Sequence, residues 1–236
     1  MKQIFFLLVS TFLSISINGQ SFIGAWEATS TSNAGVEIRN VVIFSEGYQV
    51  ATWYEAKTGK FLKTNGGTWK LESDTMTEVV EFDSENPDRV GTELSFKVRI
   101  DVNTMGIIGD SATYKRIDDG SPGKLQNAWL MSGRVRNGET QLRDVNRPRK
   151  TMKILSGTRF QWIAYNTETK KFSGTGGGTY TTIDGKYTEN IEFFSKDNSK
   201  VGMSLDFNYS IDNGNWTHTG FTSKGDPLHE IWSVRE

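Results

Sequence analysis

The sequence of 236 residues contains no cysteine. Disulfide bonds and thiolate chemistry are therefore excluded, and the fold must be stabilised by its core alone. The same absence excludes the lipid anchor that exported bacterial proteins carry on a cysteine after the signal sequence.

Histidine is almost as scarce, because His218 and His229 are the only two. A zinc site of three histidines is excluded, and a site built from both histidines and Glu230 is conceivable but not favoured. No Gly-x-Ser-x-Gly nucleophile motif occurs either. We expect no metal, no cofactor and no assigned catalytic residue.

Charge of one sign is also lacking, since 27 Lys and Arg face 28 Asp and Glu. This balance gives no reason to expect a nucleic-acid partner. The length fits one large or two small domains, and the oligomeric state is left open.

The N-terminus reads as a secretory signal peptide over residues 1–20. Lys2 is followed by the apolar stretch Ile4 to Ile17 and by the polar exit Asn18-Gly19-Gln20. A membrane anchor is less favoured, because the apolar run is short and contains Ser and Thr. We expect a secreted or periplasmic protein without stable membrane insertion after cleavage.

The rest of the chain contains a repeat. Residues such as Phe61 and Phe172, or Glu78 and Glu189, match at a constant separation of 111. A smaller separation near the start of each half predicts eight extra residues in the second copy, placed at Arg143–Lys153. Two domains, 21–118 and 122–236, are expected, joined by the turn-rich "DDGSPGK".

Both halves are expected to be all-β. "LSFKVRID" and "SLDFNYSID" alternate apolar and polar residues, turn signals recur between such segments, and no helical period appears. About eight strands fit in each half, which favours two tandem antiparallel up-and-down β-barrels. The glycine-rich "GTGGGTY" is interpreted as a hairpin with close backbone approach, because no helix follows it to bind phosphate.

Each half begins with a tryptophan and ends with an arginine. We expect Trp26 to stack on Arg116, and Trp129 on Arg235, where the first and last strands close each barrel. Gly24-Ala25-Trp26 with a late arginine resembles the lipocalin and wider calycin families, although the second copy has Asn127 in place of the glycine.

The ending "WTHTGFTSKGDPLHEIWSVRE", preceded by "DGKYTENIEFFS", resembles an uncharacterised group of secreted bacterial lipocalin-like proteins. The resemblance implies an eight-stranded barrel that encloses one small ligand. It implies no established chemistry.

A two-residue period divides the repeated glutamates into two sets. Glu78 and Glu189 share a face with apolar neighbours and should point into the barrels, whereas Glu81 and Glu192 should face solvent. An inward carboxylate needs a cation, hydrogen-bond donors or a raised pKa. An internal ion pair, a ligand contact and an acid–base role remain open.

A second candidate feature is the basic segment from Arg134 to Lys153, which lies between the first two strands of the second half. It is either a solvated loop or a cationic lid over the barrel mouth that favours an anionic ligand. The complete set of candidate ligand-binding residues is Glu78, Glu189, Trp69, Tyr180, Tyr187, Trp162, His218 and Arg149.

Three functions are compatible with these features. The favoured one is an exported protein that binds a small apolar or amphipathic, conceivably anionic, ligand inside a barrel. The second is a secreted enzyme acting on a carbohydrate or organic acid, with Glu189 as acid or base beside His218 or Tyr187. The third is an envelope module with filled barrels. A glycosidase needs two inward carboxylates in one barrel, and the period supplies one.

Overall fold

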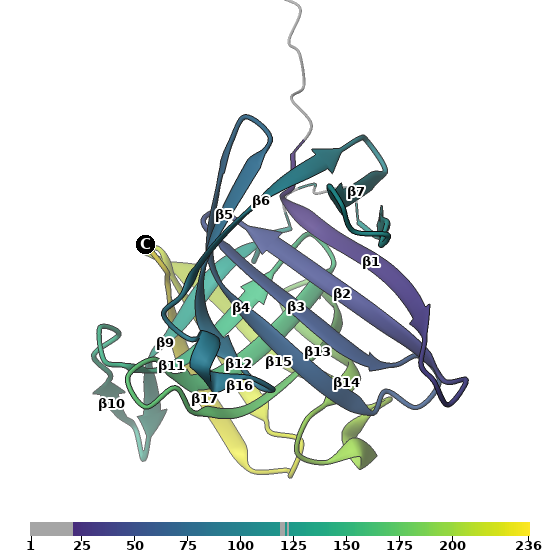
Figure 1. Ribbon diagram of the computed structural model, residues 1–236. Coiled ribbons are helices and arrows are strands. Elements are labelled where there is room, and N and C mark those ends of the chain that lie inside the picture. The colour runs from purple at the N-terminus through teal and green to yellow at the C-terminus, as the bar shows by residue number, and fades with distance from the viewer. Residues whose placement is uncertain (1–20, 119–120, 122) are drawn as a thin grey trace, which may run out of the picture.

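The computed structural model describes residues 21–118, 121 and 123–236, and in these residues the protein forms two antiparallel up-and-down β-barrels (Figure 1). The predicted signal peptide and part of the predicted linker (119, 120 and 122) lie outside the described residues. The described part contains no helix long and apolar enough to cross a membrane.

The first barrel closes through pairing of β1 with β8, and each strand pairs with the next one along the chain. Its strands are β1 (Gly24–Thr31), β2 (Glu37–Ser45), β3 (Tyr48–Glu55), β4 (Phe61–Glu72), β5 (Thr75–Asp83), β6 (Glu93–Ile100), β7 (Thr104–Ile107) and β8 (Tyr114–Arg116). A single 3₁₀ turn, η1 (Pro87–Arg89), separates β5 from β6.

The second barrel closes through pairing of β9 with β17, and β10 extends the sheet as a short strand on β9. Its strands are β9 (Asn127–Arg136), β10 (Glu139–Leu142), β11 (Arg149–Leu155), β12 (Arg159–Asn166), β13 (Phe172–Ile183), β14 (Lys186–Phe194), β15 (Ser204–Asp212), β16 (Asn215–Phe221) and β17 (Pro227–Val234). The turn η2 (Asn198–Lys200) takes the place of η1.

The repeat is visible in the strand bounds, because β4, β5 and η1 recur as β13, β14 and η2 at a separation of 111 residues. The extra residues of the second copy were predicted at Arg143–Lys153, and this position is correct only in part, because only residues 143–148 of that range lie in the loop between β10 and β11. Residues 149–153 belong to β11, and Lys153 pairs with Trp129 as Val42 pairs with Trp26. The insertion is the β10 hairpin and the loop after it, at the outer edge of the second barrel (Figure 1).

Paired glycines allow β4 and β13 to bend against their neighbours. The ladder between β4 and β5 shifts at Gly66/Gly67, and that between β13 and β14 shifts at Gly177/Gly178. A Cβ on Gly67 would lie 1.9 Å from the carbonyl oxygen of Val79, and one on Gly178 only 2.0 Å from that of Asn190. The glycine-rich motif therefore serves close backbone packing at a β-bulge.

The first barrel closes as the sequence suggests, with the guanidinium of Arg116 3.9 Å from the centroid of the Trp26 ring. Arg235 has a different position, over the ring of Tyr48 in the first barrel at 4.2 Å. The strand register explains the difference: Arg116 pairs with Trp26, but Val234 pairs with Trp129. Because neighbouring side chains point to opposite faces, a shift of one residue turns Arg235 away from Trp129 and toward the other barrel.

The two barrels pack through an interface with nearly twofold symmetry. The Tyr54 hydroxyl donates to Glu192 at 2.7 Å, and the Tyr165 hydroxyl donates to Glu81 at 2.7 Å. These contacts are reciprocal, because each residue of one pair lies 111 positions from its counterpart in the other. Phe61 stacks on its own counterpart Phe172, with ring centroids 6.1 Å apart. Such self-complementary contacts are typical of isologous interfaces.

The prediction that Glu81 and Glu192 face solvent is therefore wrong. Glu81 accepts two hydrogen bonds from Arg235, and Glu192 accepts one each from Arg39 and Arg159. The alternation correctly places both carboxylates outside their own barrels. It could not show that the outside of one barrel is covered by the other.

Candidate functional site

The first barrel encloses a cavity of about 420 Å³ whose wall is mostly apolar. Its inner part is lined by side chains such as Val42, Met76, Phe96 and Met105, which project from β2, β5, β6 and β7. Polar side chains, Glu78 on β5 among them, line the rest of the wall. A predominantly apolar wall that also carries polar groups is typical of small-molecule sites.

Glu78 has an exceptional environment for a carboxylate. It lines the cavity and makes no hydrogen bond or ion pair with any described residue. Burial raises the pKa of Glu78 to about 7, although the charge of Arg89 lowers it somewhat. At neutral pH this carboxyl group is thus divided between its neutral and ionised forms.

The two cations on the cavity wall already have carboxylate partners. Arg89 lies 2.8 Å from Asp83, and Lys63 lies 2.8 Å from Glu85. The Tyr114 hydroxyl, also at the wall, donates to the Asn40 side chain. Glu78 is therefore the wall's ionisable group without a bonded protein partner in the described residues.

The second barrel contains a smaller cavity of about 270 Å³ with a different polar centre. Glu189, the counterpart of Glu78, accepts hydrogen bonds from the Lys153 ammonium at 2.6 Å and from the Tyr187 hydroxyl at 2.8 Å. Lys153 is 5% exposed and Glu189 4%. Removal of either member of such a buried ion pair leaves an uncompensated charge and destabilises the folded protein.

Aromatic rings surround the ammonium group of Lys153. Its nitrogen lies 5.1 Å from the ring centroids of Tyr187 and Trp216, 5.3 Å from Trp232 and 5.8 Å from Phe207. The faces of aromatic rings attract cations, most strongly where water is excluded. Four rings and one carboxylate thus form a cage around a single ammonium group.

A second polar pair lies beside this cage. His218, 1% exposed, has its Nε2 atom 2.9 Å from Glu230. Burial, and then the charge of Lys153, lower the pKa of His218. Burial raises the pKa of Glu230, but the hydrogen bond with His218 acts in the opposite direction, and the pKa of Glu230 is lowered overall. A neutral imidazole beside an ionised carboxylate must donate from Nε2, so the buried Nδ1 is an acceptor, and it has no partner among the described residues.

The predicted candidate residues fall into two groups. Those that line the cavities are Glu78 in the first barrel and Glu189, Trp162 and His218 in the second. Tyr187 contacts Glu189 from within the core.

The remaining candidates do not line either barrel cavity. Trp69 donates from its indole to the carbonyl oxygens of Ser45 and Tyr48, and Tyr180 donates from its hydroxyl to that of Ser156. Arg149 is exposed at the start of β11. A ligand contact remains a prediction for these residues.

Lys153 is an interior residue that was not among the predicted ones, although the sequence contains a signal for it. At the separation of 111, Lys153 falls on Val42, so a charged residue occupies an apolar position of the repeat. Glu230 was considered only as a metal ligand. Within the described residues no group of three or more His, Asp or Glu side chains has a metal-binding arrangement.

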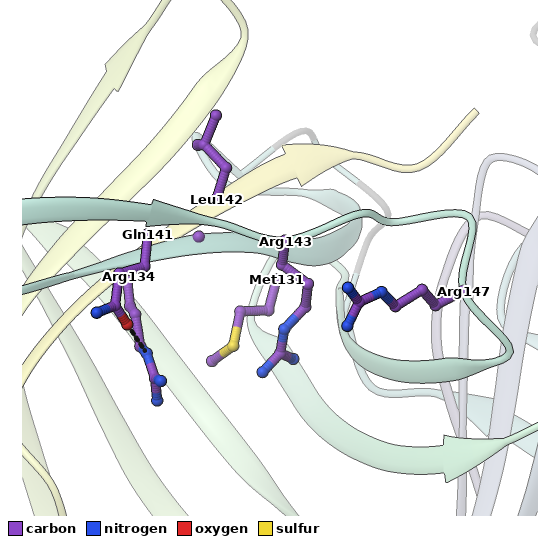
Figure 2. Close-up of a pocket in the computed structure, with 7 residues that line it drawn as sticks. Met131, Arg134, Gln141, Leu142, Arg143 and Arg147 are labelled. Atoms are coloured by element: carbon purple, nitrogen blue, oxygen red, sulfur yellow. Dashed lines mark hydrogen bonds between the residues drawn. The ribbon is translucent and has the colours of Figure 1, made fainter.

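The basic segment forms a separate cleft of about 240 Å³ beside the second barrel. Figure 2 shows Arg134, Arg143 and Arg147 around it, with the Arg134 Nε atom donating to Gln141 at 3.0 Å. Desolvation, and then the charges of the neighbouring arginines, lower the pKa of Arg143. Met131 lines both this cleft and the barrel cavity, so the two adjoin each other.

The comparisons with known proteins concern mainly the second barrel. A family model described as a domain of unknown function (DUF4488) matches residues 124–235. This stretch begins just before β9 and ends just after β17, and it is slightly less than half of the chain. No curated protein matches the chain. The second barrel is thus similar to a family whose description assigns no chemistry.

Proposed function

We propose that this protein binds a small amphipathic molecule inside its first barrel, in the manner of a lipocalin-like binding protein. The observation that carries the proposal is the cavity of about 420 Å³, with its apolar wall and the unpartnered Glu78. An apolar body would fill the wall region, and a polar group would contact the carboxyl group.

The second barrel is less suited to the same role. Its cavity is smaller, and its interior polar groups already bind one another through Lys153–Glu189 and His218–Glu230. The same pairing disfavours Glu189 as a general acid or base, because its carboxylate already accepts bonds from an ammonium and a hydroxyl group.

The binding proposal is tested with N-phenyl-1-naphthylamine, a neutral apolar dye whose fluorescence rises in apolar surroundings. We expect one dye molecule to bind per chain. Ala51 lines the cavity at the position where the second barrel has Trp162, so Ala51→Trp should fill the space and abolish binding. Ser223→Trp, at the wall of the second cavity, is the matched control and should leave binding unchanged. Equal dye binding by the Ala51→Trp variant would contradict the proposal.

We also propose that the protein is exported and loses residues 1–20, on the basis of the N-terminal pattern. N-terminal sequencing of the protein produced in a bacterial host with an active secretion system should give a start near Gln20 or Ser21. Recovery of the intact chain, starting at Met1, from the cytoplasm would exclude export.

A further inference from the structure

The two barrel interiors can be compared residue by residue, because the separation of 111 also holds inside the barrels. Both keep the inward glutamate, as Glu78 and Glu189. A position on a more distant strand of each barrel, β2 or β11, differs: the first barrel has Val42 where the second has Lys153. Val42 and Glu78 both line the first cavity, as Lys153 and Glu189 line the second.

In the second barrel the side chain of Lys153 resembles an aliphatic amine bound in the interior. It is a chain of four methylene groups with a terminal ammonium, which contacts Glu189 at 2.6 Å and four aromatic rings within 5.8 Å. In the first barrel, Val42 is too short to reach the glutamate, and the corresponding space belongs to the cavity. The first barrel thus has the carboxylate of this arrangement but not its cation.

The remaining wall of the first cavity retains part of the cage. Phe96 is the counterpart of Phe207, and Tyr114, which pairs with Met105, corresponds to Trp232, which pairs with Trp216. Two of the four rings around the ammonium group therefore have aromatic counterparts at the first cavity. Met76 and Met105 replace the other two, Tyr187 and Trp216, and leave more room.

We propose that the ligand of the first barrel is a primary amine on an apolar body, whose ammonium group binds Glu78 in the place that the Lys153 ammonium occupies beside Glu189. This inference rests on the proposed function and names its ligand class. The ammonium would supply the charge-assisted hydrogen bond that Glu78 lacks.

The charges around Glu78 favour a cation over an anion. Of the cations on the wall, Arg89 is bonded to Asp83 and Lys63 to Glu85, and Asp110 adds a further carboxylate. A ligand carboxylate would meet Glu78 without a free cation to compensate. Because burial holds the pKa of Glu78 near 7, binding of an ammonium group should release a proton below that pH and become tighter as the pH rises through 7.

The experiment measures displacement of N-phenyl-1-naphthylamine at pH 8 by three molecules of equal chain length: hexylamine, hexanol and hexanoate. We expect hexylamine to displace the dye at concentrations about tenfold lower than hexanol, and hexanoate to be the weakest. Equal or better displacement by hexanol or hexanoate would overturn the amine assignment. If the dye does not bind the wild-type protein at all, the proposed function fails instead.

Two variants and a control locate the ammonium group. Glu78→Gln should still bind the dye but lose the preference for hexylamine over hexanol. Val42→Lys should supply the missing cation within the chain and abolish displacement by hexylamine. Glu72→Gln removes a carboxylate that is 77% exposed in the same barrel and should behave as the wild type.

The pH dependence provides a test that needs no variant. Hexylamine should displace the dye more effectively at pH 8 than at pH 6, whereas hexanol should show no such change. A preference for hexylamine that persists unchanged in Glu78→Gln, or that shows no increase between pH 6 and pH 8, would assign the amine to another group and contradict the inference.

Discussion

The two barrels have the same strand order and the same inward glutamate, yet their interiors differ in kind. The second barrel pairs its glutamate with Lys153 and packs aromatic rings around the pair, so its cavity is about 270 Å³. The first barrel lacks the lysine and has a cavity of about 420 Å³ with Glu78 on its wall. The same fold therefore holds its inward carboxylate either in an ion pair within the core or on the wall of a cavity.

The aromatic content explains much of the difference in volume. Trp162, Trp216 and Trp232 of the second barrel correspond to Ala51, Met105 and Tyr114 of the first. Each replacement shortens an inward side chain, and the space that remains is bounded by rigid strands. Because cores collapse only partly around missing side chains, the space persists as a cavity.

The largest expected effect comes from breaking the ion pair of the second barrel. Lys153→Met leaves the carboxylate of Glu189 buried without its cation, which should lower the free energy of unfolding by about 3–5 kcal/mol at pH 7. Urea denaturation measures the change. The double variant Lys153→Met/Glu189→Gln should recover most of the loss, and a cost as large as that of the single variant would show that the charge is not its cause.

The next effect concerns Glu78 and its pH dependence. The folded state holds the pKa of Glu78 at about 7, above the usual value of a glutamate, so the folded state binds more protons than the unfolded state between about pH 4.5 and 7. The free energy of unfolding should therefore decrease as the pH rises from about 4.5 to 7. The contribution from Glu78 to this decrease is up to about 3 kcal/mol.

Glu78→Gln should remove that decrease and be more stable than the wild type at pH 8. Denaturation curves at pH 5 and pH 8 provide the comparison, with Glu72→Gln as the exposed control. Parallel pH profiles for the wild type and Glu78→Gln would show that folding does not raise the pKa of Glu78.

A smaller effect tests the symmetry of the interface. Tyr54→Phe and Tyr165→Phe each remove one hydroxyl donor to a carboxylate and should cost about 1.5 kcal/mol. The arginines that bond Glu192 and Glu81 remain in both variants. Similar costs in urea denaturation are expected from the reciprocal contacts, whereas a large loss in only one variant would show that the interface is energetically one-sided.

The smallest effect is expected in the basic cleft that has no counterpart in the first barrel. Arg143→Gln removes a charge whose pKa is lowered by desolvation and by neighbouring arginines. Thermal unfolding should show a change within about 0.5 kcal/mol, in the stabilising direction if repulsion dominates. A loss of several kcal/mol would mean that this cleft is part of the core of the second barrel.

The sequence was sufficient to predict the two barrels, because the signals that specify them lie within single strands and within the repeat. Alternation along strands such as β6 and β15 specifies which face is buried, and the repeat specifies that the pattern occurs twice. The inward orientation of Glu78 and Glu189 follows from the same two-residue period, and both line cavities in the structure.

Other features depend on contacts between distant residues, and the sequence did not show them. The cationic partner of Glu189 is 36 positions away, and Tyr165 and Tyr54, which donate to Glu81 and Glu192, lie in the opposite barrel. Alternation separates inside from outside but does not distinguish solvent from a neighbouring domain. The position of Arg235 was missed for a related reason, because a bulge between Ile231 and Trp232 shifts the register of β17 by one residue.

Gln161 shows what a single chain permits at a symmetric interface. It lies between the barrels, accepts a hydrogen bond from Thr52 and donates to Thr64 and Thr175, while its own counterpart in the repeat is Val50. In a dimer of identical subunits every substitution appears twice, so two glutamines or two valines would occupy these positions. Covalent fusion removes that constraint. The same freedom allows a lysine in one interior and a valine at the matching position of the other, so each half of the molecule can evolve separately without losing its partner.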